Sequence, residues 1–572
     1  MSSASIVKKS EKQKTNGAFY TPRFLADYLS DEISNEIDAS LDYSLLDPAL
    51  GEGILIESLL TILEPKNIKI SNILGIDIDA DAIKGASKNV KTINKKSSIK
   101  FLKNNALTPF GLSPEEGWLE LKKKFNRGNK FDIILSNPPW GIEISDNKKS
   151  LISSNFRLAE GQYDIYDLFI ELIISQLNEG GIYGIIIPDS IFNDEHIKLR
   201  ELLLKNSKIL ALGRLGEKIF DNVNRATTVI IGKKGVPNLN HQVKCFRLNS
   251  ENRKILQSGS QSLNEIVKQI SHYVSQNRFL QNEYYQLDID LRESERSIIK
   301  KLEVGNLKIS DYTNSTRGVE LSKKGSVVKC PNCGSWHPEP NKETFECNVC
   351  EHRINKSAIT KKKIIVNERR NGTYRPIKVG EDISRYKSKV RRSIKAGLKG
   401  INYKDPSIYE GEKIIIRKTG VGITASIDYE NSYTNQVVYI FKIRKNLRNE
   451  IPLEFILGLL NSRVYTYYLL KKNGENEWKS HPYITMRDIK DLPLPDINKV
   501  DKKTVNTISG KVRDIIENGY DIRCDKEIES EVLKLFNITK KEFKIIMSAI
   551  EACEQLIPFK RLLNIKPNEV LA

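Results

Sequence analysis

The sequence lacks any hydrophobic run long enough to cross a membrane. None of its apolar stretches reaches the roughly 18 consecutive residues that a transmembrane helix requires, and the first 17 residues contain no apolar secretory core. We therefore expect a cytoplasmic protein with no membrane partner, whose residues 1–16 form a flexible, solvated arm.

Cysteine is also scarce, and acidic residues are fewer than basic ones. Seven cysteines in 572 residues argue against a disulfide framework in a cytosolic chain. The 72 Asp and Glu residues are outnumbered by 91 Lys and Arg residues, which gives a net charge of +19. Such an excess favours a polyanionic partner such as nucleic acid, although a lysine-rich proteome encoded by an AT-rich genome produces the same excess.

A first domain of the α/β class is predicted at residues 17–240. Thr21 suits a helix N-cap and Pro22 the first helical position. Short apolar runs then alternate with amphipathic helical stretches, and these runs are Tyr43–Leu46, Ile73–Ile76, Phe131–Leu135, Ile182–Ile187 and Ala226–Ile231. This alternation indicates a doubly wound, largely parallel sheet.

The rest of the chain divides into two further regions. Residues 241–500 are irregular and contain a cysteine cluster, many basic residues and a strand-like stretch from Lys413 to Arg444. In residues 501–572 the apolar residues recur at helical spacing, which predicts three helices. We expect a mixed α+β second domain followed by a helical C-terminal segment.

A turn containing two glycines follows the first expected strand, in Asp47-Pro48-Ala49-Leu50-Gly51-Glu52-Gly53. Ligands of open α/β sheets bind beyond the carboxyl ends of the strands. Gly51 and Gly53 let the backbone approach a ligand closely, and Asp47 can orient a cationic one. Taken alone, such a segment is often only a turn.

A second acidic turn ends the next expected strand, in Gly75-Ile76-Asp77-Ile78-Asp79. An acid roughly 20 residues or more beyond the glycine turn can accept hydrogen bonds from ribose hydroxyls, whereas Asp79 suits the cap of the following helix. The glycine spacing is not GxGxxG and implies no dinucleotide pyrophosphate. A nucleoside without phosphates, such as S-adenosylmethionine, fits this pattern better.

The tetrapeptide Asn137-Pro138-Pro139-Trp140 directly follows the strand predicted at Phe131–Leu135. Two successive prolines end the strand and fix the backbone. The Asn137 side chain and the Pro138 carbonyl can then accept both hydrogens of an amino group, and Trp140 offers a face on which a planar base can stack. An Asn-Pro-Pro turn that only ends a strand is the alternative.

These motifs, in this order, resemble the amino-methyltransferases with an Asn-Pro-Pro-aromatic motif, most closely the gamma-class (Taq-type) DNA adenine N6-methyltransferases of restriction–modification systems. The resemblance implies a Rossmann-like domain that binds S-adenosylmethionine, followed by a target-recognition domain. Looser similarity extends to segments at Arg317–Glu320, Pro376–Tyr386, Lys413–Gly420 and 482–495. It further implies adenine methylation in double-stranded DNA. The absence of a Pro-Cys nucleophile beside the cofactor motifs predicts direct transfer without a covalent enzyme intermediate, and a stacked, paired adenine must be flipped out before the enzyme can reach it.

The same resemblance implies roles for individual residues. Thr21 matches a position that contacts the methionine end of the cofactor, Asp47 and Gly51 lie in the glycine-turn motif, and Asp77 takes the ribose-binding position. Asn105 stands where the family usually has an Asp that binds the cofactor's adenine amino group, and its carbonyl can accept the same hydrogen bond. Trp140 replaces the more common Tyr. Phe220 is expected either to cover the second face of the flipped base or to be a core aromatic.

Four of the cysteines have the spacing of a metal site. Cys330 and Cys333 form one CxxC pair, and Cys347 and Cys350 form a second. Two such pairs make a tetrahedral thiolate shell for structural zinc, here in a zinc ribbon at residues 326–356. Since four cysteines complete the shell, His337 and His352 are expected at the surface. The basic stretch that follows can neutralise DNA phosphates.

Three other functions remain open from the sequence. An Asn-Pro-Pro-aromatic enzyme can act on RNA or on a protein glutamine, although glutamine methylators are smaller and lack a large basic domain. A non-catalytic DNA-specificity subunit would not need the intact cofactor and Asn-Pro-Pro-Trp segments. A fused restriction enzyme would need a PD…(D/E)xK pattern, which we do not find. We therefore expect any restriction endonuclease partner to be a separate chain.

Overall fold

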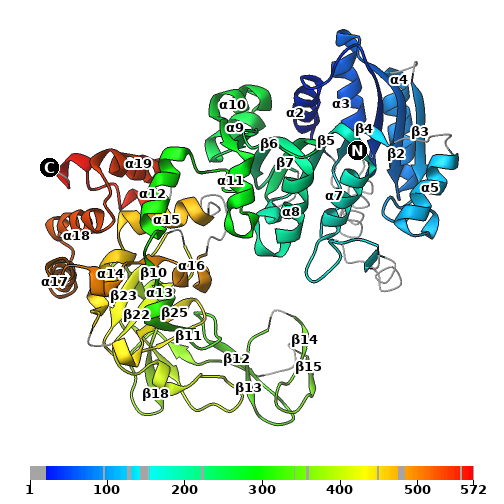
Figure 1. The fold of residues 1–572 in the computed structure, drawn as a ribbon. Coiled ribbons are helices and arrows are strands. Elements are labelled where there is room, and N and C mark those ends of the chain that lie inside the picture. The colour runs from blue at the N-terminus through cyan, green and yellow to red at the C-terminus, as the bar shows by residue number, and fades with distance from the viewer. Residues whose placement is uncertain are drawn as a thin grey trace. The chain divides into compact units, whose positions relative to one another are not determined.

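The computed structural model describes residues 21–93, 97–124, 130–141, 152–153, 155–220, 225–340, 342–355, 360–420, 422–447, 450–473, 483–553 and 557–570. The chain divides into two compact units, Met1–Arg292 and Glu293–Ala572, which run from blue to green and from green to red in Figure 1. Within the described residues, no helix is both long and apolar enough to span a bilayer.

A mixed nine-stranded sheet forms the centre of the first unit. Its strand order is β3-β2-β1-β4-β5-β7-β6-β8-β9. The first five of these strands are parallel, β7 is antiparallel to both of its neighbours, β8 is parallel to β6, and β9 is antiparallel to β8. The strands are β1 (Asp42–Asp47), β2 (Lys69–Asp77), β3 (Ser98–Lys103), β4 (Phe131–Ser136), β5 (Leu177–Pro188), β6 (Ser207–Gly216), β7 (Thr227–Lys234), β8 (Gln242–Arg247) and β9 (His272–Ser275). The predicted α/β class is confirmed.

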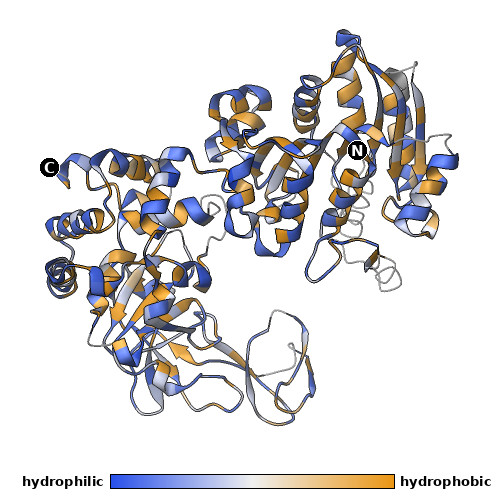
Figure 2. Ribbon diagram, viewed as in Figure 1, coloured by the Kyte–Doolittle hydropathy of each residue, from blue (hydrophilic) through white to orange (hydrophobic). Residues whose placement is uncertain are grey.

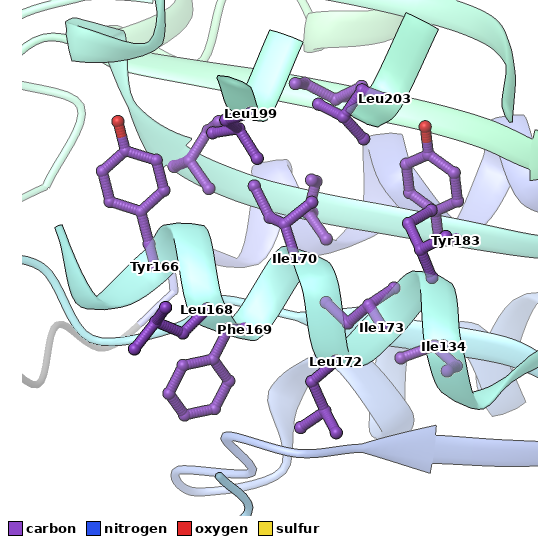
Figure 3. Close-up of a cluster of buried hydrophobic side chains, with 14 of the residues drawn as sticks. Ile134, Tyr166, Leu168, Phe169, Ile170, Leu172, Ile173, Tyr183, Leu199 and Leu203 are labelled. Carbon is purple, nitrogen blue, oxygen red and sulfur yellow. The ribbon is translucent and has the colours of Figure 1, made fainter. Parts of the chain in front are cut away.

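Helices cover both faces of this sheet because successive strand residues point to opposite faces. Ile133 and Leu135 pack in one buried cluster, and the intervening Ile134 packs in another. The first cluster includes residues of α2 (Arg23–Ser34), α3 (Ile54–Leu63), α4 (Ala80–Ile93), α9 (Ser250–Gln257) and α10 (Leu263–Ile270). The second, part of which Figure 3 shows, includes residues of α5 (Pro114–Lys124), α7 (Ile165–Gln176), α8 (Ile197–Asn206) and α11 (Gln276–Gln281). The strands between them are largely hydrophobic (Figure 2).

The first compact unit extends past residue 240, where the sequence pattern ended the first domain. β8 pairs with β6 in register from Ala211 with Lys244 to Arg214 with Arg247, and Ile266 and Val267 of α10 are buried against the core that contains α2. β8 and α10 contact elements that precede them in the sequence and are not adjacent to them, and local periodicity gives no sign of such contacts.

Several small sheets make up the core of the second unit. The larger ones have the orders β11-β25-β22-β23, β17-β21-β18-β24 and β13-β12-β16. The strand-like stretch predicted from Lys413 to Arg444 is confirmed as four strands. The strands are β10 (Leu307–Lys308), β11 (Thr313–Arg317), β12 (Ser326–Lys329), β13 (Trp336–Pro338), β14 (Thr344–Glu346), β15 (Arg353–Asn355), β16 (Lys361–Lys363), β17 (Ile365–Val366), β18 (Tyr374–Lys378), β19 (Ile383–Ser384), β20 (Lys387–Ser388), β21 (Arg392–Lys395), β22 (Lys413–Arg417), β23 (Ala425–Asp428), β24 (Tyr433–Thr434), β25 (Val438–Ile443) and β26 (Pro493–Leu494).

The C-terminal helices belong to this second unit. A Cβ added at Gly458 would lie 2.5 Å from Ile508, so the glycine allows α14 and α17 to pack closely. Arg463 is buried and pairs with Asp525 at 3.1 Å and with Glu529 at 2.9 Å, which ties α15 to α18. The helices are α12 (Glu293–Glu303), α13 (Ile309–Tyr312), α14 (Leu453–Leu460), α15 (Arg463–Asn473), α16 (Met486–Lys490), α17 (Lys502–Asn518), α18 (Ile522–Leu535), α19 (Lys540–Glu551) and α20 (Ile557–Lys560).

Candidate active site

The carboxyl ends of β1, β2, β3 and β4 lie along the same edge of the sheet because these strands are parallel. Asp47 is the last residue of β1 and Asp77 the last of β2, while Asn105 and Asn137 closely follow β3 and β4. The fold therefore places four of the predicted site residues along one edge. This is the edge at which open α/β sheets bind their ligands.

Asp47 is fully buried. Its Oδ1 accepts a hydrogen bond from the Ala49 backbone N–H at 3.0 Å, whereas Oδ2 has no hydrogen-bond partner among the described residues. Burial raises the pKa of this carboxyl to about 8, and the nearby charge of Asp77 contributes to the rise. A buried carboxylate oxygen without a partner is the acceptor that a cationic or hydrogen-bonding ligand would satisfy.

The two glycines of the turn differ in their surroundings. Gly51 has a φ of +54°, and a Cβ added there would meet nothing within 4 Å. Gly53 has a φ of +80°, but its Cβ would lie 3.0 Å from the Cβ of Ala86 on α4. Gly51 therefore leaves open space beside the backbone, whereas Gly53 is required for the packing of α3 against α4 and offers no room for a ligand.

The Asp77 carboxylate holds the two acidic turns together. Its Oδ2 accepts from the Gly51 backbone N–H at 2.8 Å, and its Oδ1 accepts from the Asp79 N–H at 2.8 Å. Burial raises the pKa of Asp77. Asp79 accepts from the Asp81 N–H at 2.9 Å at the start of α4, which confirms its predicted capping role.

Asn105 uses its side chain within its own turn. Its Oδ1 accepts from the Leu107 N–H at 2.9 Å, and its backbone N–H donates to Asn104 Oδ1 at 2.8 Å. The Asn104 N–H in turn donates to the Asp77 carbonyl at 2.8 Å. A carbonyl oxygen has two lone pairs, so Asn105 retains the capacity to accept one further hydrogen bond.

Asn137 and Thr21 lie side by side although 116 residues separate them in sequence. The Asn137 Nδ2 donates to the Thr21 Oγ1 at 3.1 Å, and the Thr21 side chain is buried. The predicted N-cap is wrong by one residue: Pro22 occupies the N-cap position and α2 begins at Arg23. The Thr21 hydroxyl is thus available to Asn137, because capping does not use it.

Trp140 and Phe220 are both buried and contact each other directly. Their ring centroids are 5.2 Å apart and their planes meet at 83°, an edge-to-face arrangement. A base stacked between two rings requires them to be parallel and about 7 Å apart, twice the carbon contact distance. The rings must therefore separate before a base can lie between them.

Three further groups at this edge were not predicted from the sequence. Asp164 accepts from the Gly141 N–H at 3.0 Å and caps α7, which the Asp164-x-x-Asp167 capping-box pattern could have indicated. The buried Asp189, directly after β5, pairs with Arg214 and accepts from Thr228 at 2.8 Å. A third group is a buried chain of hydrogen bonds that runs through Ser190, Tyr166, His196 and Asp167. These last two groups depend on tertiary contacts and leave no sequence pattern.

The four predicted cysteines come together in the second unit. Their sulfurs all lie within 4.8 Å of one another, with Sγ–Sγ distances of 3.6 Å from Cys333 to Cys347 and 3.8 Å from Cys330 to Cys350. A tetrahedral zinc with Zn–S bonds of about 2.3 Å places its sulfurs about 3.8 Å apart. The cluster therefore has the geometry that zinc requires.

One histidine beside this cluster is not at the surface. His337 is buried, and its Nε2 lies 3.3 Å from Cys347 Sγ and 3.1 Å from Ser335 Oγ. The surface prediction for His337 is wrong because β13 pairs His337 with Val328 of β12, which is itself fully buried. His352 is exposed as predicted, and its carbonyl accepts from the Cys347 N–H at 2.9 Å.

Two regions of the chain match known protein families. Residues 71–220 match the family described as Eco57I restriction-modification methylase, and residues 375–494 match the TaqI-like C-terminal specificity domain. The first match contains Asp77, Asn105, the Asn-Pro-Pro-Trp segment and Phe220. The cysteine cluster lies between the two matched regions.

Curated relatives show the same similarity. The chain is 29% identical over 219 residues to the type II methyltransferase M.BanIII of Aneurinibacillus aneurinilyticus, covering 36% of this chain and 37% of the relative. It is 25% identical over 250 residues to the type II methyltransferase M.VspI of Vibrio sp. (strain 343), covering 42% of this chain and 54% of the relative. The aligned regions thus span between a third and about half of these relatives.

One solved structure resembles the fold over nearly the full length. The type IIL restriction-modification enzyme MmeI, solved in complex with DNA, aligns with a TM-score of 0.50 and 13% sequence identity. The alignment covers 97% of this chain and 79% of that protein. At this identity the likeness concerns the fold alone.

Proposed function

We propose that this chain, in which an Eco57I-type methylase region precedes a TaqI-like specificity domain, transfers a methyl group from S-adenosylmethionine to the N6 amino group of an adenine in duplex DNA. The observation that carries the proposal is the position of Asn137. It directly follows β4, its amide is bonded to Thr21, and it shares the ligand-binding edge with the buried Asp47 carboxylate.

The residues of this edge fit the cofactor. Asp47 offers the partnerless carboxylate oxygen, Gly51 leaves open space at the backbone, and Asp77 can accept from ribose hydroxyls beyond its bonds to the turn. Asn105 would receive the adenine amino group and Thr21 would face the methionine end. When bound, the cofactor supplies an electrophilic methyl group. The protein residues orient the reactants.

Asn137 and Pro138 would act on the substrate amino group. The Asn137 Nδ2 donates to Thr21, so its carbonyl oxygen is the atom that can accept a substrate N–H. The Pro138 carbonyl would accept the second N–H. Two accepted hydrogen bonds raise the electron density on the nitrogen and direct its lone pair toward the methyl group. Because an amino nitrogen attacks directly, no enzyme nucleophile is needed.

Trp140 and Phe220 would hold the extruded base on its two faces. Adenine in a duplex is stacked and paired, so the enzyme must take it out of the helix at a cost of a few kcal/mol. Stacking on aromatic rings returns part of that cost. The edge-to-face contact between the two rings must open first.

The first test identifies the modified base directly. Long-read, methylation-sensitive sequencing of DNA from cells that express the chain should reveal N6-methyladenine at one sequence motif, and cells that express the Asn137→Ala variant should lack the signal. The motif should be fully modified if the chain protects DNA from a separate restriction endonuclease. Cytosine modification, or unmodified DNA together with methylated RNA or protein, would reject the proposal in favour of another amino-methyltransferase.

We also propose that Cys330, Cys333, Cys347 and Cys350 hold one structural zinc. A closed thiolate shell leaves no position for substrate, so the metal would stabilise the fold and take no part in the chemistry. Cys347→Ser should lose the zinc, as measured by elemental analysis, and weaken DNA binding. Cofactor binding by the first unit should be unchanged.

Cys524→Ser provides the matched control, because it removes a buried thiol that lies outside the cluster. This control should keep one zinc per chain and normal DNA affinity. Metal-free wild-type protein that binds DNA normally would show that zinc has no structural role here.

A further inference from the structure

The cysteine cluster lies in a strongly basic part of the chain, and the family matches, which end at residue 220 and resume at residue 375, leave most of this part uncovered. Residues 323–399 contain 20 Lys and Arg residues against 7 Asp and Glu residues. Their net charge of +13 is about two thirds of the +19 of the whole chain, in about one seventh of its length. Charge at this density suits a polyanion.

Three consecutive lysines of this region form an edge strand. β16 consists of Lys361, Lys362 and Lys363, which we call the lysine edge, and all three side chains are exposed. β16 lies at one side of the sheet β13-β12-β16, where β12 is the one strand that pairs with it among the described residues. Successive side chains point to opposite faces, so Lys361 and Lys363 lie on one face and Lys362 on the other. Because no strand covers the outer side of β16 among the described residues, the long lysine stems let all three ammonium groups reach one ligand that lies along this edge.

Acidic residues neutralise little of the positive charge of the lysine edge. Within the described residues, Lys361 pairs with Glu339 at 3.2 Å across a largely exposed ion pair, while Lys362 and Lys363 belong to no ion pair. Lys329 on β12 is exposed and lies on the same face as Lys362, since Lys362 pairs with Val327 two residues before it. An exposed ion pair contributes at most about 1 kcal/mol, so Lys361 can exchange Glu339 for another anion.

The cysteine cluster anchors this edge. β12 runs directly into Cys330, and the Lys329 N–H donates to the Thr360 carbonyl at 3.1 Å, just before β16. The position of the lysine edge is therefore linked through β12 to a cysteine of the cluster. The edge is a fixed part of a folded element.

We propose that the lysine edge binds the phosphate backbone of duplex DNA and adds affinity that is independent of base sequence. This inference rests on the proposed function, which supplies duplex DNA as the partner. DNA carries one negative charge per about 1.7 Å of helix axis, so a row of three cations meets complementary charge wherever it contacts the backbone. Lysine contacts phosphate as a point charge and reads no base.

Edge lysines also have a second known use, which is to prevent sheets from pairing edge to edge. That use predicts self-association when the lysines are removed and no effect on DNA. The two explanations therefore differ in what they predict for one variant, and DNA binding measured at several salt concentrations separates them.

The test is the triple variant Lys361→Gln, Lys362→Gln, Lys363→Gln in the full chain with its zinc. Fluorescence anisotropy with a mixed-sequence 30-base-pair duplex would give Kd from about 50 to 200 mM salt. Each lost phosphate contact should reduce the slope of log K against log salt by about 0.9, so the variant's slope should be shallower by about 2 to 3. The preference for the methylated motif over mixed sequence should stay the same.

The matched control is Lys540→Gln, Lys541→Gln, Lys544→Gln on α19, where three exposed lysines belong to no ion pair among the described residues. An unchanged slope in the lysine-edge variant, an equal loss in the control, or self-association with normal DNA binding would overturn the proposal. The assay needs no methyl transfer. A protein that binds DNA with the expected slopes and methylates none would contradict the proposed function and leave the lysine edge supported.

Discussion

Replacing Asn137 with alanine is expected to lower turnover on DNA by on the order of 10²–10³-fold, the loss typical when one group that acts on developing charge is removed. Affinity for S-adenosylmethionine should change little, because the assigned role of Asn137 lies with the substrate amino group. Its side-chain hydrogen bond to Thr21 is a part-buried contact at 3.1 Å, and an intramolecular hydrogen bond of this kind contributes only about 0.5–1.5 kcal/mol. Single-turnover methylation and calorimetric titration of the cofactor would measure the two effects separately.

Two companion variants test the geometry of this prediction. Thr21→Val removes the hydroxyl that orients the Asn137 amide and should reduce both turnover and cofactor affinity. Trp140→Ala should impair methylation and increase the fluorescence of 2-aminopurine placed at the target adenine, because the quenching ring is gone. Near-normal turnover in Asn137→Ala would remove the amide from the mechanism, and an unchanged probe with normal methylation in Trp140→Ala would remove the stacking role.

Replacing Asp47 with asparagine is expected to stabilise the cofactor-free protein while abolishing cofactor binding. Burial raises the pKa of Asp47 to about 8 from an ordinary value of 3.8. The folded state therefore holds a proton that the unfolded chain releases at lower pH. The protonated Asp47 side chain therefore leaves the wild type at its full stability below about pH 4. Between about pH 4 and pH 8 the free energy of unfolding falls by about 1.4 kcal/mol per pH unit. A neutral amide carries no such penalty.

Thermal unfolding at pH 5, 7 and 8.5 would test this second prediction. The melting temperature of Asp47→Asn should exceed that of the wild type by an amount that grows from pH 5 to pH 8.5, and added cofactor should raise the melting temperature of the wild type only. Asp79→Asn is the matched control, since asparagine also caps helices, and it should behave as the wild type. A stability difference that is the same at every pH would contradict the raised pKa.

Much of the first unit could be predicted because its strands are apolar runs with clear ends. The strands around Leu46, Ile76, Ile134 and Ile185 are where periodicity placed them. β3 was missed because it lies at the sheet edge and reads Ser-Ile-Lys-Phe-Leu-Lys, with every side chain exposed or half-buried. β6, β8 and β9 were missed because long-range pairing, rather than local pattern, makes them strands.

The candidate site shows the same division. Acidic and amide residues at successive strand ends could be placed on one edge because parallel strands bring their carboxyl ends together. The bond from Asn137 to Thr21, the packing role of Gly53 and the burial of His337 could not be predicted. Each depends on residues brought together from separate elements, and the sequence carries no spacing rule for such contacts.

The contact between Trp140 and Phe220 gives the free protein an internal competitor for its own substrate. An edge-to-face aromatic pair contributes about 0.5–1.5 kcal/mol beyond its buried area, and under the proposed stacking role this energy must be given up before a base enters. This energy makes the fraction of molecules with separated rings roughly two- to twelvefold smaller than it would be without the ring contact. The apparent affinity for an extruded base falls by the same factor. Free nucleobases, which stack without the support of DNA backbone contacts, are therefore the molecules that this ring pair excludes most effectively.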